Sequence, residues 1–439
     1  MDPAKKLANH ILSSRLDRIP KKAIERAKLS ILDTIATAIG GSDDPISHAV
    51  RRFGQYSQGK PESRVWIFGE KLPAGLATLV NAVVARALDF DETYELCVNG
   101  CHASAYDIPP AFALAERDPT ITGAEFLTAV ITGMDIHLRL ALTVTSNAID
   151  TGRDNIVASW GTTAVAARLL KLNEKQILDS FGIAYAQAAG EFQMYEETSH
   201  TVALQQGLRA RTGVDSAMFA LAGLNGPHEP FLGKYGFFKA FEPEHDLKPL
   251  LDGLGEDYIN ANISFKPWPA CKCTHPGIFG MLQLREKEKF TADDVVAIEV
   301  GVNRMAEGLV VQPRAVKWNP QDPVDGRFSL PAVPTGVREI EIEYVGLDLF
   351  KRQVGVNAGA TTAVDAGLKS EVLRMAAFEV AEAARGQALA INQQKTARGI
   401  VNIVSEETFG AMNDGNIGYA LQRLPGLTVN EDGTARPGA

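Results

Sequence analysis

Residues 72–88 read LPAGLATLVNAVVARAL, and this stretch decides the fold class. It is apolar on nearly every side and rich in alanine, so a helix formed here would have no face suited to water. Such a helix suits a place buried among other helices better than a place on the surface. The stretch therefore predicts the interior of a mainly α-helical domain.

Helical patterns lie on both sides of it. Residues 24–39 carry apolar side chains at helical spacing before the stop signal Gly40-Gly41; the positions are Ile24, Ala27, Ile31, Ile35 and Ile39. Thr122 and Glu125 form a capping-box pattern that opens a helix to about residue 144. Further helices are predicted over residues 161–172, 177–190 and 214–224. We expect an all-helical domain over residues 1–262.

The pattern changes twice after this domain. A helix over about 274–286 and a strand candidate at 295–302 (VVAIEVGV) predict a partial α/β lid domain over residues 263–330. Strict alternation at 338–345 (REIEIEYV) predicts an antiparallel strand, and residues 350–356 predict another. The expected fold is mainly α: a large helical domain, a truncated lid, and a small β or irregular segment over 331–439.

Composition narrows the classes of function. The chain has 439 residues, 45% of them hydrophobic and 22% charged, with a formal net charge of -9. That charge argues against nucleic acid or an anionic membrane as a partner. The first 20 residues lack the features of a secretory signal, and no apolar run is long enough to span a membrane, so we expect a cytoplasmic protein.

The acidic run at 88–93 (LDFDET) is the first candidate site. Asp89 and Thr93 lie in it, and His102 and Ser104 follow shortly after. These residues supply a general base, a hydrogen-bond donor and a proton carrier on one loop. An acidic helix end followed by an ordinary loop is the alternative interpretation.

Residues 266–275 (KPWPACKCTH) form the second candidate site. Prolines keep this backbone extended, so Lys266 can project as a fixed cation, which is what a carboxylate substrate needs. A surface lysine beside a rigid linker is the alternative. Cys271, Cys273 and His275, like Cys97 and Cys101, lack the paired spacing of structural zinc sites, so we expect no metal.

Taken together, these stretches resemble the MmgE/PrpD family over about residues 1–330. The resemblance also rests on residues 32–36 (LDTIA), the helix from Gly161, the GLRARTG run at 207–213, and KWNPQDPVDGRFSL at 317–330. The family includes 2-methylcitrate dehydratases, cis-aconitate decarboxylases and an iminodisuccinate epimerase.

The resemblance implies a cleft between a helical domain and a lid, a homodimer, no cofactor, and a small di- or tricarboxylate substrate. It implies that Asp89, His102 and Lys266 are catalytic, with Lys266 binding a carboxylate and His102 or Asp89 moving the proton alpha to it. Thr93, Ser104 and His275 would bind substrate. The implied reaction is a dehydratase-like lyase; epimerisation within the family and a non-catalytic fusion product are the alternatives.

Two departures from the family pattern bear on the reaction. Dehydratase and decarboxylase relatives carry a histidine in an HP motif before the helix from Gly161, where this chain reads TGRDN at 151–155. They also carry a lysine shortly before the GLRARTG run, where this chain reads TVA at 201–203. His200 and Arg153 lie nearby and are candidate substitutes. An epimerase tolerates the lost histidine better, because it needs no acid for a leaving group.

The C-terminal segment resembles a different family. Residues 334–347 and the later run ALQRLPGL at 420–427 are similar to the periplasmic β-sandwich and plug start of a TonB-dependent receptor. We expect a fusion near residues 325–335, with 331–439 contributing no transport function. Alternatively, the strands from 338 onward replace strands of the lid.

Overall fold

The computed structural model describes residues 2–57, 59–197, 199–291, 294–295, 297–312, 317, 336–342, 350–356, 427–429 and 435–437. The chain divides into two compact units, Met1–Ser329 and Leu330–Ala439. The three-domain division, with boundaries after residues 262 and 330, stays a prediction.

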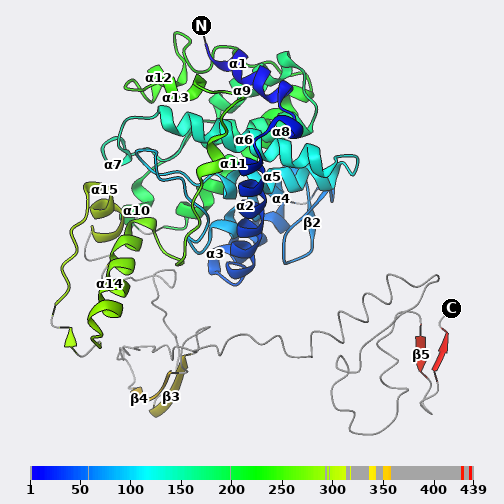
Figure 1. Ribbon diagram of the computed structural model, residues 1–439. Helices are drawn as coiled ribbons and strands as arrows, with labels where there is room; N and C mark the ends of the chain where they lie inside the picture. The colour runs from blue at the N-terminus through cyan, green and yellow to red at the C-terminus, as the bar shows by residue number, and fades with distance from the viewer. Residues whose placement is uncertain are drawn as a thin grey trace. The chain divides into compact units, whose positions relative to one another are not determined.

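The first unit is built from helices (Figure 1). Its longer helices are α1 (Ala4–Ser13), α2 (Lys21–Gly40), α3 (Pro45–Tyr56), α4 (Ala74–Arg86), α5 (Ser104–Arg117), α6 (Gly123–Thr143), α8 (Ala158–Leu169), α9 (Glu174–Ala186), α11 (Thr201–Leu221) and α14 (His275–Glu288). Its shorter helices are α7 (Ala148–Thr151), α10 (Gln193–Glu197), α12 (Phe237–Ala240), α13 (Lys248–Leu251) and α15 (Arg304–Ala306). Two short strands, β1 (Ser63–Arg64) and β2 (Lys71–Leu72), pair with each other. The prediction of a mainly α fold is confirmed.

Helix α4 lies at the centre of this unit, as its sequence predicts. Every residue from Ala74 to Arg86 is buried. Helix α11 packs against both α4 and α8, and α6 packs against α8. Because α4 ends inside the bundle, the loop that follows it begins in a buried environment.

Helix α2 forms where it is predicted and ends at Gly40, but its buried face differs in part from the expected one. The buried residues are small: Ala23, Ala27, Ser30, Thr34, Thr37 and Ala38. Ile39 is 59% exposed, and Ile31 and Ile35 are only partly buried. Small side chains allow closer approach of neighbouring helices. The apolar pattern located the helix and part of its core face: Ala27 is buried and Ile24 and Ile31 pack against the core, whereas Ile39 is exposed.

Helix α6 confirms the capping box. The Thr122 hydroxyl accepts from the Glu125 backbone N–H at 3.2 Å, and the Glu125 carboxylate accepts from the Thr122 N–H at 2.8 Å. Within the described residues, α6 is the one helix long and apolar enough to cross a membrane. Most of it is buried among other helices, as expected of a core helix, so it gives little support for a membrane span.

The strand expected at 295–302 is wrong within the part that the structure describes. Residues 297–303 have no regular secondary structure. Ile298, Val300 and Val302 are 62%, 54% and 44% exposed. A strand needs a neighbour for its backbone hydrogen bonds, and the strands described in this unit, β1 and β2, pair only with each other. The helix predicted before it is confirmed as α14.

The described residues of the second unit form two pairs of antiparallel strands. Strand β3 (Gly336–Ile342) pairs antiparallel with β4 (Phe350–Val356), with Ile340 opposite Arg352. This confirms the two predicted strands as far as residue 342 for the first and over the whole of the second. Strand β5 (Leu427–Val429) pairs with β6 (Ala435–Pro437). Residues 404–426, which contain most of the receptor-like motifs, lie outside the described residues.

Candidate functional site

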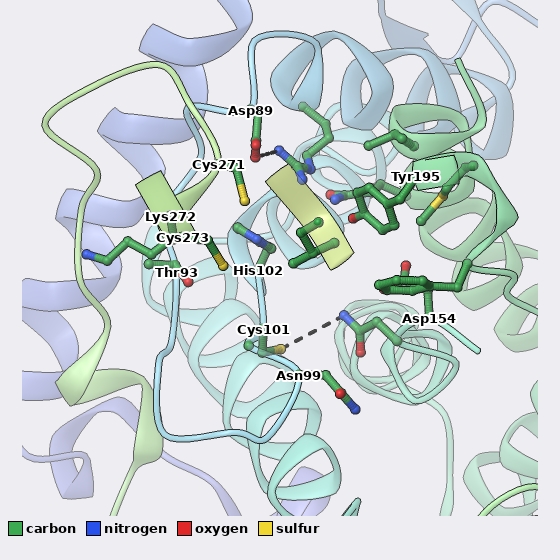
Figure 2. Close-up of a pocket in the computed structure, with 18 of the residues that line it drawn as sticks. Asp89, Thr93, Asn99, Cys101, His102, Asp154, Tyr195, Cys271, Lys272 and Cys273 are labelled. Carbon is green, nitrogen blue, oxygen red and sulfur yellow. Dashed lines mark hydrogen bonds and ion pairs between the residues drawn. The ribbon is translucent and has the colours of Figure 1, made fainter. Parts of the chain in front are cut away.

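A cavity of about 540 Å³ opens in the first unit beside the loop that follows α4. Its wall combines this loop with the start of α5, helix α10, the N-terminal part of α11 and residues 271–273 (Figure 2). Segments far apart in the sequence therefore contribute side chains to one cavity that is open to solvent on one side. Its size suits a small organic acid.

Asp89 lies at one side of this cavity and is held by two cations. Arg86 Nη1 donates to the Asp89 carboxylate, and Lys266 Nζ donates to Asp89 Oδ1 and to its backbone oxygen, both at 2.6 Å. The backbone of Asp89 has a φ of 49°, in the left-handed region that residues other than glycine seldom adopt. Arg86 at the end of α4 and Lys266, which is distant in the sequence, both stabilise this turn.

The paired cations make Asp89 a weak base. Burial alone would raise the pKa of Asp89, but attraction to Arg86 and Lys266 outweighs burial and holds the pKa below its usual range. A carboxylate with a depressed pKa and hydrogen bonds from two cations has little tendency to accept a proton. Of the two candidate bases that the sequence offered, Asp89 is the less suited.

His102 differs from Asp89 in its hydrogen bonds. Its Nδ1 lies 2.7 Å from the backbone oxygen of Glu92, and a carbonyl oxygen can only accept, so Nδ1 carries the hydrogen. The lone pair is then on Nε2, which has no hydrogen-bond partner among the described residues, and the ring borders the cavity. Burial lowers the pKa of His102 to about 4, although Asp91 opposes the change. At neutral pH this imidazole is an uncharged base.

Buried carboxyl groups lie behind these two residues. The Ser104 backbone N–H donates to Glu92 Oε1 at 2.5 Å, and Asp33 Oδ2 accepts from the Glu92 backbone N–H at 3.2 Å. Burial, with repulsion from Asp91, raises the pKa of Glu92 to about 8 and that of Asp33 to about 6. Arg86 Nη1 donates to Asp91 Oδ1 at 3.0 Å. No cation among the described residues forms an ion pair with Glu92. With its pKa raised to about 8, the Glu92 carboxyl group is mostly protonated at neutral pH.

The structure brings half of the six predicted site residues to the cavity wall. Asp89, Thr93 and His102 border it. Lys266, Ser104 and His275 are buried behind or beside it and are not part of the wall.

Each of these three residues makes contacts that stabilise the surrounding structure. The Lys266 ammonium is bound to Asp89, and Ser104 begins α5 and positions Glu92. His275 Nε2 donates to the Ala270 oxygen at 3.2 Å, and its ring packs edge-on against Trp268. Their predicted roles toward a substrate stay predictions.

The two candidate substitutes for the missing family residues differ in position. His200, at the start of α11, borders the cavity. Arg153 does not, and forms an ion pair with Glu242 at 3.3 Å. Only His200 remains placed to act on a ligand in this cavity.

Several cavity residues were missed by sequence reasoning. Tyr106, Tyr195 and Gln206 border the cavity from helices that otherwise pack in the core. Behind them, buried Arg209 donates to the Tyr106 hydroxyl and to Asp154 Oδ2, both at 3.2 Å. The sequence signal that could have indicated these residues is Arg209. An arginine on the buried face of a helix needs polar partners nearby.

The four cysteines are free thiols. No group of three His, Cys, Asp or Glu side chains placed to hold a metal occurs in the residues that the structure describes. The expectation of no metal stays a prediction. Cys271 and Cys273 border the cavity near Asp89 (Figure 2).

We expect Cys273 to be the most reactive of the four thiols. A hydrogen bond from Cys271 lowers the pKa of Cys273, with Lys266 contributing, whereas burial raises the pKa of Cys97 to about 12 and that of Cys101 well above its usual range. Because the thiolate is the reactive form, iodoacetamide near pH 7 should modify Cys273 first. Peptide mass spectrometry over a time course measures the order. Modification of Cys97 or Cys101 ahead of Cys273 would contradict this electrostatic argument.

The fold and cavity thus define a helical protein with an uncharged imidazole, a doubly held carboxylate and several cations around one small-molecule site. Residues 5–250 match the MmgE/PrpD N-terminal domain. Since the match covers more than half of the chain, the protein belongs to the MmgE/PrpD family.

Curated relatives show the same similarity. The chain is 27% identical over 278 residues to a cis-aconitate decarboxylase of Homo sapiens, a stretch that covers 61% of this chain and 56% of the relative. It is 26% identical over 285 residues to a cis-aconitate decarboxylase of Aspergillus terreus, covering 62% and 58%. A cis-aconitate decarboxylase-like protein of Aspergillus oryzae is 26% identical over 319 residues, covering 67% and 63%. The chain therefore spans a little over half the length of the curated relatives it matches.

Proposed function

We propose that the cavity binds a small di- or tricarboxylate and that His102 transfers the proton at the carbon alpha to a carboxylate. The observation that carries the proposal is the hydrogen bond from His102 Nδ1 to the Glu92 oxygen, which leaves Nε2 as the base at the cavity wall. General bases of this kind contribute about 10²- to 10⁴-fold to a rate.

The charges around His102 suit the intermediate of such a reaction. Removal of an alpha proton moves negative charge onto the substrate carboxylate, and fixed cations nearby stabilise that charge. Arg86 borders the cavity and pairs with Asp89 and Asp91, and Lys266 lies behind Asp89 and pairs with its carboxylate. Substrate binding next to Asp89 would place the acid in the field of both cations.

The substrate class rests on the relatives and on the cavity. The relatives are named for cis-aconitate, a small tricarboxylate. Lys272 and Lys317 also border the cavity, where Lys272 forms an ion pair with Glu95 and Lys317 Nζ donates to the Tyr195 backbone oxygen, both at 2.7 Å. The reaction we propose is that of a dehydratase-like lyase in which His200 acts as the acid for the leaving group.

One observation favours the isomerase alternative. The wall at the position of the missing HP-motif histidine carries Asp154 and Asn155. Asp154 Oδ2 accepts from Arg209, and an amide such as Asn155 is no acid at neutral pH. An epimerase needs proton removal and return but no acid for a leaving group, so it is compatible with this wall.

Solvent-deuterium exchange at the alpha carbons of a panel of di- and tricarboxylates tests the proposal. The wild-type protein should exchange at least one acid, and Lys266→Met should exchange it at least about tenfold more slowly, because one charge-stabilising interaction is commonly worth that much. Arg153→Met, which removes a cation outside the cavity, is the matched control and should retain the wild-type rate.

Two further results separate the alternatives. Loss of turnover but not of exchange in His200→Ala would support the lyase. No exchange of any acid by folded protein would overturn the proposal and favour a non-catalytic product. The expected homodimer, the cytoplasmic location and the receptor-like origin of residues 331–439 are proposals that rest on family resemblance and sequence alone.

A further inference from the structure

Tyr106 borders the cavity from the first turn of α5, and the function proposed above gives it no part. Its phenol oxygen accepts a hydrogen bond from Arg209 Nη1 at 3.2 Å. The same nitrogen donates to Asp154 Oδ2, and Asp154 also belongs to the cavity wall (Figure 2). Arg209 is buried and is not part of the wall. One guanidinium behind the wall therefore holds two polar side chains that border the cavity.

The direction of the bond from Arg209 leaves the phenol free to donate. A guanidinium has donors only, so the Tyr106 oxygen accepts and its own hydrogen is available for another partner. No described residue accepts that hydrogen. Burial raises the pKa of Tyr106 to about 13, although Arg209 opposes the change. The phenol is therefore un-ionised at neutral pH and can donate to a ligand.

The Tyr106 ring is held by the core behind it. It packs edge-on against the imidazole of His137 on α6, with the ring centroids 5.3 Å apart. His137 is itself completely buried; its Nδ1 lies 3.0 Å from Asp107 Oδ2, and its Nε2 lies 3.5 Å from Cys101 Sγ. Because these partners hold the imidazole on two sides, the ring that packs against it has little freedom to turn.

Arg209 is fixed as firmly as the ring. It donates to the backbone oxygens of Ala189 and Asp154 and to Gln205 Oε1, at 3.3, 2.8 and 2.9 Å. Gly190 provides the room for these contacts, because a Cβ at position 190 would overlap both Arg209 Nη2 and the Asp154 oxygen. The donor to Tyr106 is therefore in place before any ligand binds.

The charge of Arg209 strengthens the phenol as a donor. Hydrogen bonds in a chain polarise one another, so a phenol that accepts from a cation donates more strongly. Within the described residues, Asp154 is the one carboxylate paired with Arg209. A ligand oxygen that accepts from Tyr106 thus becomes the end of a chain that starts at a buried cation, and this arrangement favours negative charge on that oxygen.

We propose that the Tyr106 hydroxyl donates a hydrogen bond to the substrate carboxylate that takes up negative charge when His102 removes the alpha proton. Tyr106 is then a catalytic residue, and Arg209 is a positioning residue that acts through it. The inference rests on the proposed function. It applies to the lyase and to the isomerase alike, because both begin by moving the electron pair of a C–H bond onto that carboxylate.

The sequence of proton movements needs no co-reactant. The alpha C–H bond breaks as His102 Nε2 gains the proton, and the electron pair moves onto the carboxylate oxygens. Tyr106 keeps its proton throughout and only shares it with one of these oxygens. His102 lies two residues before α5 and Tyr106 lies in its first turn, so both side chains reach the cavity from the same end of this helix.

Tyr106→Phe tests the inference in the full-length protein, because it keeps the ring and removes only the hydroxyl. Proton NMR in deuterium oxide measures alpha-proton exchange against acid concentration. Loss of a donor to a developing negative charge should lower the exchange rate at saturating acid about 100-fold, with KM within about threefold of wild type. Tyr94→Phe is the matched control. Tyr94 is also buried but does not border the cavity, so its variant should keep the wild-type rate.

Two variants of Arg209 give a second comparison that does not depend on Tyr106→Phe. Arg209→Lys keeps a positive charge behind the phenol, whereas Arg209→Gln keeps only a neutral donor. With folding verified by circular dichroism, the lysine variant should retain at least about tenfold more exchange at saturating acid than the glutamine variant. Equal rates in the two variants would overturn the role of the Arg209 charge.

The outcomes separate this inference from the proposed function. A saturated exchange rate in folded Tyr106→Phe within about threefold of wild type would overturn the role of Tyr106 and leave that of His102 intact. A raised KM with an unchanged saturated rate would also overturn it, because the hydroxyl would then bind the acid equally before and during the reaction. An equal fall in Tyr94→Phe would assign the loss to packing. No exchange of any acid by folded wild type would overturn both proposals.

Discussion

Replacing His102 by glutamine should slow alpha-proton exchange by about 10²- to 10⁴-fold, the usual contribution of a general base. The glutamine amide can still donate to the Glu92 oxygen, so the loop keeps its anchor while the basic nitrogen is removed. Proton NMR in deuterium oxide at neutral pH measures the rate. Wild-type activity should be constant between about pH 5 and pH 8 and fall as the pH approaches 4, where His102 gains a proton.

Asp89→Asn is the comparison that makes this prediction specific. The amide oxygen of asparagine can still accept from Arg86 and Lys266, so the hydrogen bonds of the turn survive. Because the pKa of Asp89 is already depressed, loss of its basicity should matter less than loss of His102. A larger loss of exchange in Asp89→Asn than in His102→Gln would reverse the assignment of the base.

The helical framework could be predicted from the sequence because each helix is indicated by a pattern of neighbouring residues. The all-apolar run of α4 and the capping box of α6 depend on neighbouring residues alone, and both formed as predicted. The buried face of α2 could be predicted only in part from neighbouring residues. Small side chains such as Ser30 and Thr34 carry a weak hydrophobic signal, and their burial is decided by how closely the neighbouring helices approach.

The strand at 295–302 failed for a related reason. Alternating apolar residues show that a segment suits a sheet, but a strand forms only beside a partner. Ile298 and Val300 stay exposed in the described structure because nothing pairs with them. A strand requires both a suitable local sequence pattern and a neighbouring strand. A short stretch of sequence reveals only the pattern.

The part of the candidate site that lies in one short motif could be predicted from the sequence. Asp89, Thr93 and His102 lie within a short segment and meet at the cavity. The partnership of Lys266 with Asp89 joins residues far apart in the chain, so the sequence could suggest a cation there but not its salt bridge. The pairing of His137 with Cys101 and Asp107 could not be predicted for the same reason, because His137 lies on α6, about 30 residues further along the chain.

The stability of the protein should depend on pH through Glu92, which is completely buried. Its pKa is raised from 4.5 to about 8 by burial and by repulsion from Asp91 and Asp33. The folded state therefore binds a proton that the unfolded chain releases, so the stabilisation is full below about pH 4.5 and is lost as the pH rises through 8. Each tenfold difference in proton affinity between the folded and unfolded states corresponds to about 1.4 kcal/mol of free energy.

Two neighbouring groups determine the best pH window for the test. The pKa of Asp33 is raised to about 6, which adds a change of the same sign at lower pH. The pKa of His102 is lowered to about 4, which adds a change of opposite sign below its ordinary value of 6.5. Between pH 6.5 and pH 8.5 Glu92 by itself should lower the free energy of unfolding by about 2 kcal/mol. The lowered pKa of Cys273 adds a change of opposite sign in the same window, so the contribution of Glu92 is the difference between wild type and a Glu92 variant.

Glu92→Gln should remove most of that fall. The glutamine side-chain oxygen can still accept from the Ser104 N–H, but it has no charge to bury at high pH. Urea unfolding followed by circular dichroism at the two pH values gives the free energies, and Glu95→Gln, on an exposed side chain of the same loop, is the control that should keep the wild-type dependence. If Glu92→Gln lost as much stability as wild type between pH 6.5 and pH 8.5, Glu92 would have to be ionised in the folded protein. The proton that we assign to Glu92 would then be absent from the folded protein.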